Sequence, residues 1–352
     1  MAELETLLKQ AVDAHASDIF IMAGMPLTYK ANGRMVHLNE EKIMPPQSEA
    51  LVREIYAFGG RDVEQVLETG DDDFSITVPN LSRFRISIYK QRGSLAAVIR
   101  VIPFGIPDYK TLQIPESVMA VAEKTKGLVL VTGPAGGGKS TTLACVIDRI
   151  NQTREGHIIT LEEPIEYLHR NAKCAVSQRE IGLDTESYLS GLRASLRQAP
   201  DVILLGEMRD YETIRTAMTA AETGHLVIAT LHTIGAASTV DRVIDVFPPH
   251  QQQQIRVQLS NTLEAVISQQ LIPTADGKHR VAAFEVMHAN HAVRNLIREG
   301  KSHQLASVMQ TNRKLGMITM DEAIVQLYFE GKIDREHAIQ FAQDPDSMEN
   351  KI

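Results

Sequence analysis

The chain has 352 residues, 43% of them hydrophobic, and carries a formal net charge of −8. This length and composition can bury a large core and indicate two domains, while the acidic balance argues against nucleic acid as a partner. No stretch reaches the roughly eighteen apolar residues of a membrane span and the N-terminus lacks a signal pattern, so we expect a cytoplasmic protein without direct membrane insertion.

The N-terminal part of the chain predicts a small α+β module, which we bound at residues 1–102. One helix is expected over 4–15, and another around Leu51, Ile55 and Tyr56. Strand-like segments occur at 17–22, 26–30, 35–38, 71–74 and 83–89, with Asn32-Gly33 as a tight turn between the second and the third. Strands outnumber helices here, which is typical of the α+β class.

Residues 103–112 are expected to form a linker to a second domain at 113–352. The segment 103–107 contains two prolines and a glycine, and it interrupts the chain before a new helical start near Pro115. Apolar strand candidates then alternate with helices, which is the pattern of an α/β sheet. The strand candidates are 127–131, 157–161, 202–205, 225–231 and 281–286, and long amphipathic helices are expected over 252–268 and most of 290–342. The fold class is therefore α/β, with a helical C-terminal region.

Residues 133–140 form a complete G-x-x-x-x-G-K-S phosphate loop. Its members are Gly133, Pro134, Ala135, Gly136, Gly137, Gly138, Lys139 and Ser140. The continuous apolar run 127–131 before the loop predicts a buried strand, and the one-sided apolar stripe over 143–150 after it predicts a helix. Phosphates would then lie at a helix N-terminus, where free N–H groups and the macrodipole favour anions. We predict that residues 133–140, together with Thr141, bind a nucleoside triphosphate.

Two residues of the loop have roles of their own in this motif. Lys139 places a positive charge against the outer phosphates, and the hydroxyl of Ser140 is suited to ligate Mg²⁺. The backbone of the glycines lets successive N–H groups turn towards phosphate oxygens. The loop alone does not specify which reaction follows.

Acidic residues follow two of the predicted strands. Hydrolysis needs one acid to hold the water shell of Mg²⁺ and another to orient or deprotonate the attacking water. We assign the first task, directly or through water, to Glu207, which follows the strand 202–205. We assign the second to Glu166, although Glu162 and Glu163 are equally available on sequence grounds. Many phosphate-loop enzymes have Asp at the end of the Glu207 strand, so one glutamate could serve both tasks here.

Histidines and arginines supply further candidates. His225 and His232 bracket an apolar strand, where each could bond a phosphate or be satisfied by the backbone. Arg83 and Arg85 alternate with apolar residues and share one polar strand face, and Arg92 lies just beyond them. A guanidinium supplied from another subunit can stabilise a transferring phosphoryl group, but the pattern alone favours a solvated strand face.

Together these motifs resemble the secretion and pilus ATPase superfamily, and within it the pilus retraction ATPases. The similar segments cover nearly the whole chain and include 133–142, 162–166, 205–210, 223–233 and the stretch Ala-Val-Arg-Asn-Leu-Ile-Arg-Glu at 292–299. The resemblance implies a PAS-like N-terminal domain and a RecA-like ATPase domain. It also implies ATP and Mg²⁺ as ligands, a homohexameric ring with ATP at subunit interfaces, and an inner-membrane pilus platform protein as partner.

The resemblance also implies roles for individual residues. It gives the general-base role to Glu166 and the Mg²⁺ role to Glu207. It makes site residues of the two histidines and of the three arginines, which are His225, His232, Arg83, Arg85 and Arg92. Four positions depart from the family pattern, namely Ala135 and Gly137 in the loop, Glu163 in the acidic motif and Val293 in the last stretch.

The function implied is a hexameric motor at the inner face of the cell membrane that hydrolyses ATP to power type IV pilus retraction and twitching motility. One alternative is an assembly ATPase, or a type II or competence secretion ATPase, of the same superfamily. Pilus-extension enzymes usually carry a four-cysteine zinc motif and a longer N-terminal region, and this chain has neither feature. A second alternative, from another class, is a nucleotide-gated scaffold with little hydrolysis, against which the carboxylates of Glu166 and Glu207 argue.

Overall fold

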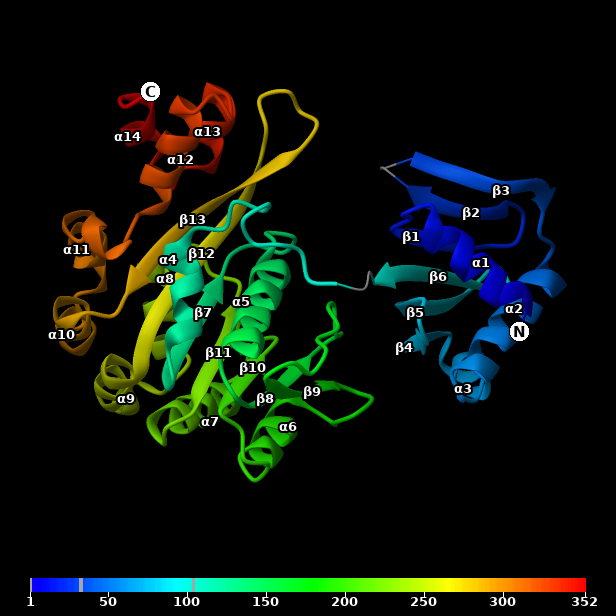
Figure 1. The fold of residues 1–352 in the computed structure, drawn as a ribbon, viewed down its shortest axis with the longest axis horizontal. Coiled ribbons are helices and arrows are strands. Elements are labelled where there is room, and N and C mark those ends of the chain that lie inside the picture. Colours follow the sequence, from blue (N-terminus) through cyan, green and yellow to red (C-terminus); the bar gives the residue numbers. More distant parts are fainter. Residues whose placement is uncertain (1, 32–33, 103–104) are drawn as a thin grey trace. The chain divides into compact units, whose positions relative to one another are not determined.

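The computed structural model describes residues 2–31, 34–102 and 105–352. By contacts the chain divides into two compact units, Met1–Gly105 with Glu166–Leu168, and Ile106–Ile165 with His169–Ile352. The turn expected at Asn32-Gly33 and the start of the expected linker, at 103–104, lie outside the described residues. The α/β class expected from the sequence is confirmed, with one sheet in each unit (Figure 1).

The N-terminal unit is a six-stranded sheet in the order β3-β2-β1-β6-β5-β4, in which all pairings are antiparallel. Its strands are β1 Asp18–Ile21, β2 Pro26–Ala31, β3 Arg34–Lys42, β4 Asp71–Val78, β5 Ser82–Gln91 and β6 Ser94–Ile102. Its helices are α1 Ala2–Asp13, α2 Pro45–Phe58 and α3 Glu64–Thr69. Along β5, buried residues alternate with half-buried ones, so Phe84 and Ile86 enter the core while Arg83 and Arg85 share the other face.

The second unit is built on a seven-stranded sheet in the order β13-β12-β7-β11-β10-β8-β9, in which only β13 is antiparallel to its neighbour. Its strands are β7 Gly127–Thr132, β8 Gly156–Glu162, β9 Cys174–Glu180, β10 Val202–Leu205, β11 Leu226–Leu231, β12 Leu263–Pro273 and β13 Arg280–His288. Its first helices are α4 Glu116–Met119, α5 Lys139–Thr153, α6 Tyr188–Ser195, α7 Tyr211–Glu222, α8 Ala236–Asp245 and α9 Pro249–Thr262. The C-terminal helices are α10 His291–Glu299, α11 Leu305–Thr311, α12 Met320–Phe329, α13 Arg335–Phe341 and α14 Pro345–Glu349.

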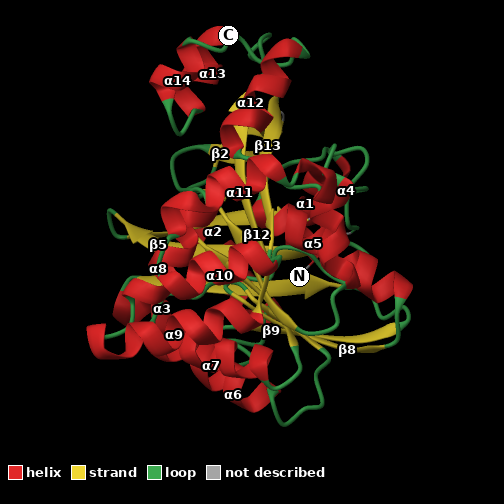
Figure 2. Cartoon of the chain, turned by 90° about the vertical axis from the view of Figure 1, so that its left-hand side faces the viewer, coloured by secondary structure: helices red, strands yellow, loops and turns green. Residues whose placement is uncertain are grey.

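Helices cover both faces of this sheet, so its central strands are buried on both sides (Figure 2). In β7, Leu128 and Leu130 pack in a cluster with residues of α7 to α11, while Val129 and Val131 pack in a second cluster with α4 and α5. This arrangement explains the continuous apolar runs seen in the sequence, because every residue of such a strand faces a core. It also places the end of β7 directly before α5.

The expected helix over 252–268 is wrong over its last residues, 263–268. The helix α9 ends at Thr262, and the following residues form the long strand β12, which pairs with β7 on one side and β13 on the other. Leu263, Val266 and Ile267 fit a helical period, but they are apolar because both faces of β12 are buried. The strand β9 was also not expected, since its buried and exposed positions do not form a clear apolar run.

The hairpin of β12 and β13 continues past β7 to α12, α13 and α14, where a separate small core forms around Ile272, Met320 and Ile324 (Figure 1). A membrane-spanning helix would have to be both long and apolar, and within the described ranges none of the helices meets both conditions.

Candidate nucleotide-binding site

The phosphate loop connects the end of β7 to the start of α5, as the sequence predicted, and its shape is set by the neighbouring strand β12. Gly133 has φ +139°, and a Cβ there would lie 2.1 Å from the carbonyl oxygen of Gln269. Gly138 has φ +85°, and a Cβ there would lie 2.7 Å from Nε2 of the same glutamine. Side chains are therefore excluded at both ends of the loop, which leaves its backbone accessible for a ligand.

The side chain of Lys139 folds back over the first residues of the phosphate loop. Its Nζ donates hydrogen bonds to the carbonyl oxygens of Gly133 and Pro134, both at 2.9 Å. Ser140 and Thr141 are half-buried in the first turn of α5, and Ala135 is exposed. The ammonium is thus held at the loop by weak neutral acceptors, which the charged oxygens of a phosphate can replace with stronger bonds.

The sequence analysis missed Gln269, which lies directly after the segment 252–268 that was interpreted as helix. It is buried on β12, and its Oε1 accepts a hydrogen bond of 2.7 Å from the hydroxyl of Thr142. One side chain therefore fixes α5 against β12 beside the loop. The signal in the sequence that could have indicated it is a run of three polar residues, 268–270, between apolar ones.

A cavity of about 580 Å³ lies next to the loop and could accept the nucleoside part of a ligand. Its lining includes Gly138, Thr141 and Thr142 near the loop, and also His279 and Arg280. The phosphate cradle and this cavity together fit a nucleotide. A larger cavity, of about 800 Å³, lies below α12.

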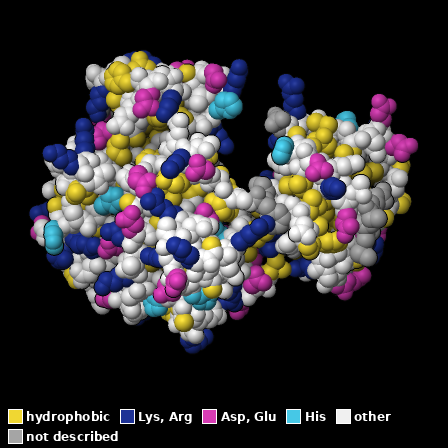
Figure 3. Space-filling view, viewed as in Figure 1, with side chains coloured by type: hydrophobic (Ala, Val, Ile, Leu, Met, Phe, Trp, Pro, Cys, Tyr) yellow, Lys and Arg dark blue, Asp and Glu magenta, His cyan; other side chains and the backbone are white. Residues whose placement is uncertain are grey.

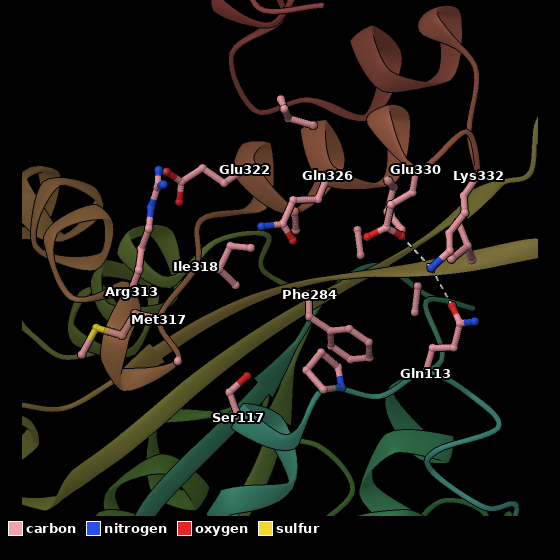
Figure 4. A pocket seen from close by; sticks show the side chains of 18 of the residues that line it. Gln113, Ser117, Phe284, Arg313, Met317, Ile318, Glu322, Gln326, Glu330 and Lys332 are labelled. Carbon is pink, nitrogen blue, oxygen red and sulfur yellow. Dashed lines mark hydrogen bonds and ion pairs between the residues drawn. The ribbon is translucent and has the colours of Figure 1, made fainter.

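This second cavity shares no residue with the phosphate loop. Figure 4 shows Phe284 and Ile318 on its inner wall and Lys332 at its rim, where Lys332 bonds to Glu330 and Gln113. Hydrophobic side chains gather in the recess under the C-terminal helices in Figure 3.

Glu207, Arg209 and His232 form a cluster beyond the ends of β10 and β11. Oε2 of Glu207 lies 2.7 Å from NH2 of Arg209, and Oε1 lies 3.1 Å from Nε2 of His232. The side chain of Glu207 is 16% exposed. The hydrogen bond from Arg209 lowers the pKa of Glu207 below its ordinary value, and the nearby His232 lowers it further, against the opposing effect of burial. Glu207 is therefore a carboxylate at neutral pH.

The backbone around Glu207 is fixed by its neighbours. Gly206 donates its N–H to the carbonyl oxygen of Leu161 at 2.7 Å, and its own carbonyl oxygen accepts from the hydroxyl of Thr230. A Cβ at Gly206, where many phosphate-loop enzymes have Asp, would lie 2.8 Å from the hydroxyl of Tyr188 and 3.1 Å from the carbonyl oxygen of Leu161, so a side chain there would be crowded. Burial raises the pKa of Tyr188, and the charges of Glu163 and Glu207 raise it further. The sequence analysis did not single out this tyrosine.

The parallel sheet brings most of the predicted residues to one edge. The strands β7, β8, β10 and β11 run in the same direction, so the phosphate loop, Glu207 and His232 all follow carboxyl ends. His225 precedes β11 and lies at the opposite edge, about 20 Å away along a strand of this length. Its Nδ1 lies 3.0 Å from the carbonyl oxygen of Ala220 near the end of α7. Within one chain, the structure does not bring His225 to the phosphate loop.

The structure distinguishes the three carboxylates at the end of β8 and in the loop after it. Glu162 accepts from the hydroxyl of Thr160 at 2.6 Å and from Nε2 of Gln178 at 3.2 Å, so it is already engaged. Glu163 and Glu166 are exposed, in a loop without regular structure. This loop is anchored where the N–H of Ile165 donates to Glu180 at 3.2 Å.

Arg83, Arg85 and Arg92 lie in the N-terminal unit. The first two are half-buried on β5, and Arg92 is exposed at the turn between β5 and β6 with φ +49°. NH1 of Arg83 donates to the hydroxyl of Thr77 at 3.4 Å.

Mg²⁺ fits the residues available beside the loop. Over the described part of the chain there is no group of three or more His, Cys, Asp or Glu side chains that could hold a metal ion alone. Mg²⁺ usually binds through one or two protein oxygens together with water and substrate phosphates. The hydroxyl of Ser140 and the ionised carboxylate of Glu207 are donors of that kind.

A model of the type II/IV secretion system protein family matches residues 2–341. The type IV pilus retraction ATPase PilT of Pseudomonas aeruginosa is 45% identical over 347 residues, which cover 98% of this chain and 100% of that relative. The twitching motility protein of Neisseria gonorrhoeae is 50% identical over 276 residues, 78% of this chain and 74% of the relative. A crystal structure of the pilus retraction motor PilT with bound ADP has a TM-score of 0.90 at 44% identity, covering 99% of this chain and 98% of the other.

Proposed function

The chain belongs to the type II/IV secretion system protein family, and on that basis we propose that it is an ATP-hydrolysing motor that powers retraction of type IV pili. The observation that carries this proposal is the glycine-bounded loop with Lys139 over it, in a chain similar along its whole length to a retraction motor with bound ADP. The names of its relatives support a role in pilus retraction and twitching motility.

In the proposed mechanism, bound MgATP supplies the phosphoanhydride bond that is cleaved. The backbone N–H groups of residues 136–140 and the ammonium of Lys139 hold the phosphates, and Lys139 exchanges the carbonyl oxygens of Gly133 and Pro134 for them. The oxygens of Ser140 and Glu207 hold the metal ion. His232 keeps the carboxylate of Glu207 in position through its hydrogen bond.

Glu166 takes the proton of the attacking water in this proposal. It is an exposed carboxylate in the loop that follows the carboxyl end of β8, whereas Glu162 accepts hydrogen bonds from Thr160 and Gln178. A base must be able to approach the water that it deprotonates, and an exposed loop carboxylate can do so.

We further propose a homohexamer in which a neighbouring subunit completes the site. Arg83, Arg85 and Arg92 would stabilise charge on the phosphoryl group, and His225 would act at a subunit boundary, since within its own chain it lies away from the loop. The ring would work in the cytoplasm against an inner-membrane platform protein.

Hydrolysis is tested with the Glu166→Gln protein. We expect it to bind ATP with near-normal affinity and to lose about a hundredfold or more in kcat, because the base is removed while the phosphate cradle stays. Glu163→Gln, which changes the other exposed carboxylate of the loop, is the matched comparison. Near-normal turnover of Glu166→Gln would transfer the base role to Glu163 or Glu207. No turnover by the wild-type protein would favour a nucleotide-gated scaffold.

Retraction is tested by deleting the gene. Cells should keep their pili, which would no longer retract, and twitching should stop. Loss of the pili themselves would instead favour the assembly ATPase, and intact pilus dynamics with a secretion defect would favour a secretion ATPase. Re-expression of Lys139→Ala, with wild-type protein as the control, separates the need for nucleotide from the need for the protein.

A further inference from the structure

The loop between β11 and α8, residues 232–235, is connected to the nucleotide-binding site at two points. His232 bonds to Glu207 at 3.1 Å. At the start of α8, the hydroxyl of Thr239 lies 2.7 Å from that of Thr233 and 3.5 Å from that of Thr132, the last residue of β7. The position of this loop therefore affects both the carboxylate of Glu207 and Thr132, the residue directly before the phosphate loop.

The same loop is held from the opposite side by the hairpin of β12 and β13. The hydroxyl of Ser268, on β12, accepts the N–H of Gly235 at 2.9 Å. Glu285 lies opposite Ser268 on β13, and its Oε1 accepts the N–H of Ala236 at 2.5 Å. Ser268 and Glu285 are both buried, with Glu285 only 4% exposed.

The second oxygen of Glu285 binds a different helix. Oε2 accepts the N–H of Met320 at 2.9 Å, and Met320 is the first residue of α12. One buried carboxylate thus bonds the first residues of α8 and α12, both of which carry N–H groups without a partner inside their own helix. Burial raises the pKa of Glu285, and the two backbone N–H groups oppose that rise by stabilising the carboxylate.

The C-terminal helices add a further connection. Asp321, next to Met320, accepts the N–H of Gln343 at 2.7 Å and that of Asp344 at 3.2 Å. Gln343 in turn packs against Gly235, since a Cβ at that glycine would lie 2.8 Å from its Nε2. The start of α12, the start of α14 and the 232–235 loop therefore form one bonded group.

We propose that Glu285 is a positioning residue, which holds the 232–235 loop so that His232 meets Glu207 and which makes that position depend on α12. The proposal rests on the ATPase function proposed above. Both carboxylate oxygens are needed because each accepts a backbone N–H. A glutamine in its place would present its NH₂ group to one of the two backbone N–H groups, and that hydrogen bond would be lost.

The test is steady-state ATPase kinetics of Glu285→Gln. We expect kcat to fall by about tenfold to a hundredfold while KM for ATP changes by less than about twofold, because the phosphate cradle is untouched and only the geometry of Glu207 is disturbed. Glu264→Gln is the matched control, since Glu264 is an ion-paired glutamate at the start of β12 that does not bond to the 232–235 loop, and its change should leave both constants unaltered.

The double variant Glu285→Gln/His232→Ala identifies the route of the effect. If Glu285 acts through His232, the double variant has the same kcat as His232→Ala alone. Multiplication of the two separate losses would overturn the proposal, and so would a folded Glu285→Gln protein with wild-type kcat. Absence of turnover in the wild-type protein would instead refute the proposed ATPase function.

Hydrogen–deuterium exchange of the wild-type protein provides a measurement that does not depend on a variant folding. Addition of a non-hydrolysable ATP analogue should change exchange in peptides covering 232–239 and, with them, in peptides covering 318–322. A change confined to the first segment would show that α12 is not coupled to the site and would overturn that part of the proposal.

Discussion

The two ends of β11 carry the same residue type in opposite situations. His232, after the strand, bonds to the carboxylate of Glu207 beside the phosphate loop. His225, before the strand, lies against the carbonyl oxygen of Ala220 near the end of α7. A parallel sheet has a direction, and in such sheets ligands bind beyond the carboxyl ends of the strands. A residue next to a strand is therefore a candidate for the site only if it adjoins the carboxyl end of that strand.

The strand β7 shows the same contrast with lysines. Lys126 is exposed directly before it, and Lys139 lies at the phosphate loop after it. We expect Lys139→Ala to lower ATP turnover by more than about a hundredfold, because the charge over the phosphates is lost. Lys126→Ala should retain wild-type kcat and KM. Equal losses in both variants, measured as ATPase rates of folded protein, would contradict the assignment of the site to one edge.

The two histidines give the next largest effect. His232→Ala should lower kcat by about tenfold to a hundredfold, since Glu207 loses one of its two partners. His225→Ala should leave ATP binding by the subunit unchanged and lose about 1 kcal/mol of stability with its hydrogen bond near the end of α7. A large loss of kcat in His225→Ala that appears only in the assembled ring would place His225 at a subunit boundary.

The smallest effect concerns pH. The folded-state pKa of Glu207 is lowered by Arg209, so the carboxylate stabilises the protein above its unfolded-state pKa, and this contribution is lost as the pH falls through the folded value. Arg209→Gln should raise the pKa of Glu207. The acidic limb of the ATPase pH profile should then move to higher pH, with kcat at neutral pH reduced only modestly. An unchanged acidic limb would show that another group controls it.

The sequence predicted best where a function needs a local motif. Residues 133–140 and Glu207 are recognisable because the loop and the acid each follow an apolar run directly. The partners that come from distant segments could not be predicted in this way. Gln269 contacts the loop only because β12 pairs beside β7, and that strand has a helical period in its apolar residues. Glu285 belongs to no sequence motif. It bonds the first residues of two helices, α8 and α12, which lie far from it in the sequence.

The acidic segment after β8 shows a second limit of prediction. Sequence alone could not choose among Glu162, Glu163 and Glu166, since all three follow the same strand. In the structure Glu162 differs from the other two, because one of its oxygens accepts hydrogen bonds from Thr160 and Gln178. Gln178 lies on β9, an edge strand whose mixture of polar and apolar residues does not predict a strand.

The close approach of Gly133 to Gln269 has a consequence for mutational tolerance. The obstacle at Gly133 is a backbone oxygen of β12, which no change of side chain can move, so any substitution there separates two strands of the sheet. At Gly137 the backbone has an ordinary φ, and a Cβ would lie 3.0 Å from the carbonyl oxygen of Pro134, which a small shift can relieve. Variants at Gly133 should therefore disappear from a library selected only for folded protein, while serine at 137 should persist. Loss of a variant at the first glycine is thus no evidence about nucleotide binding.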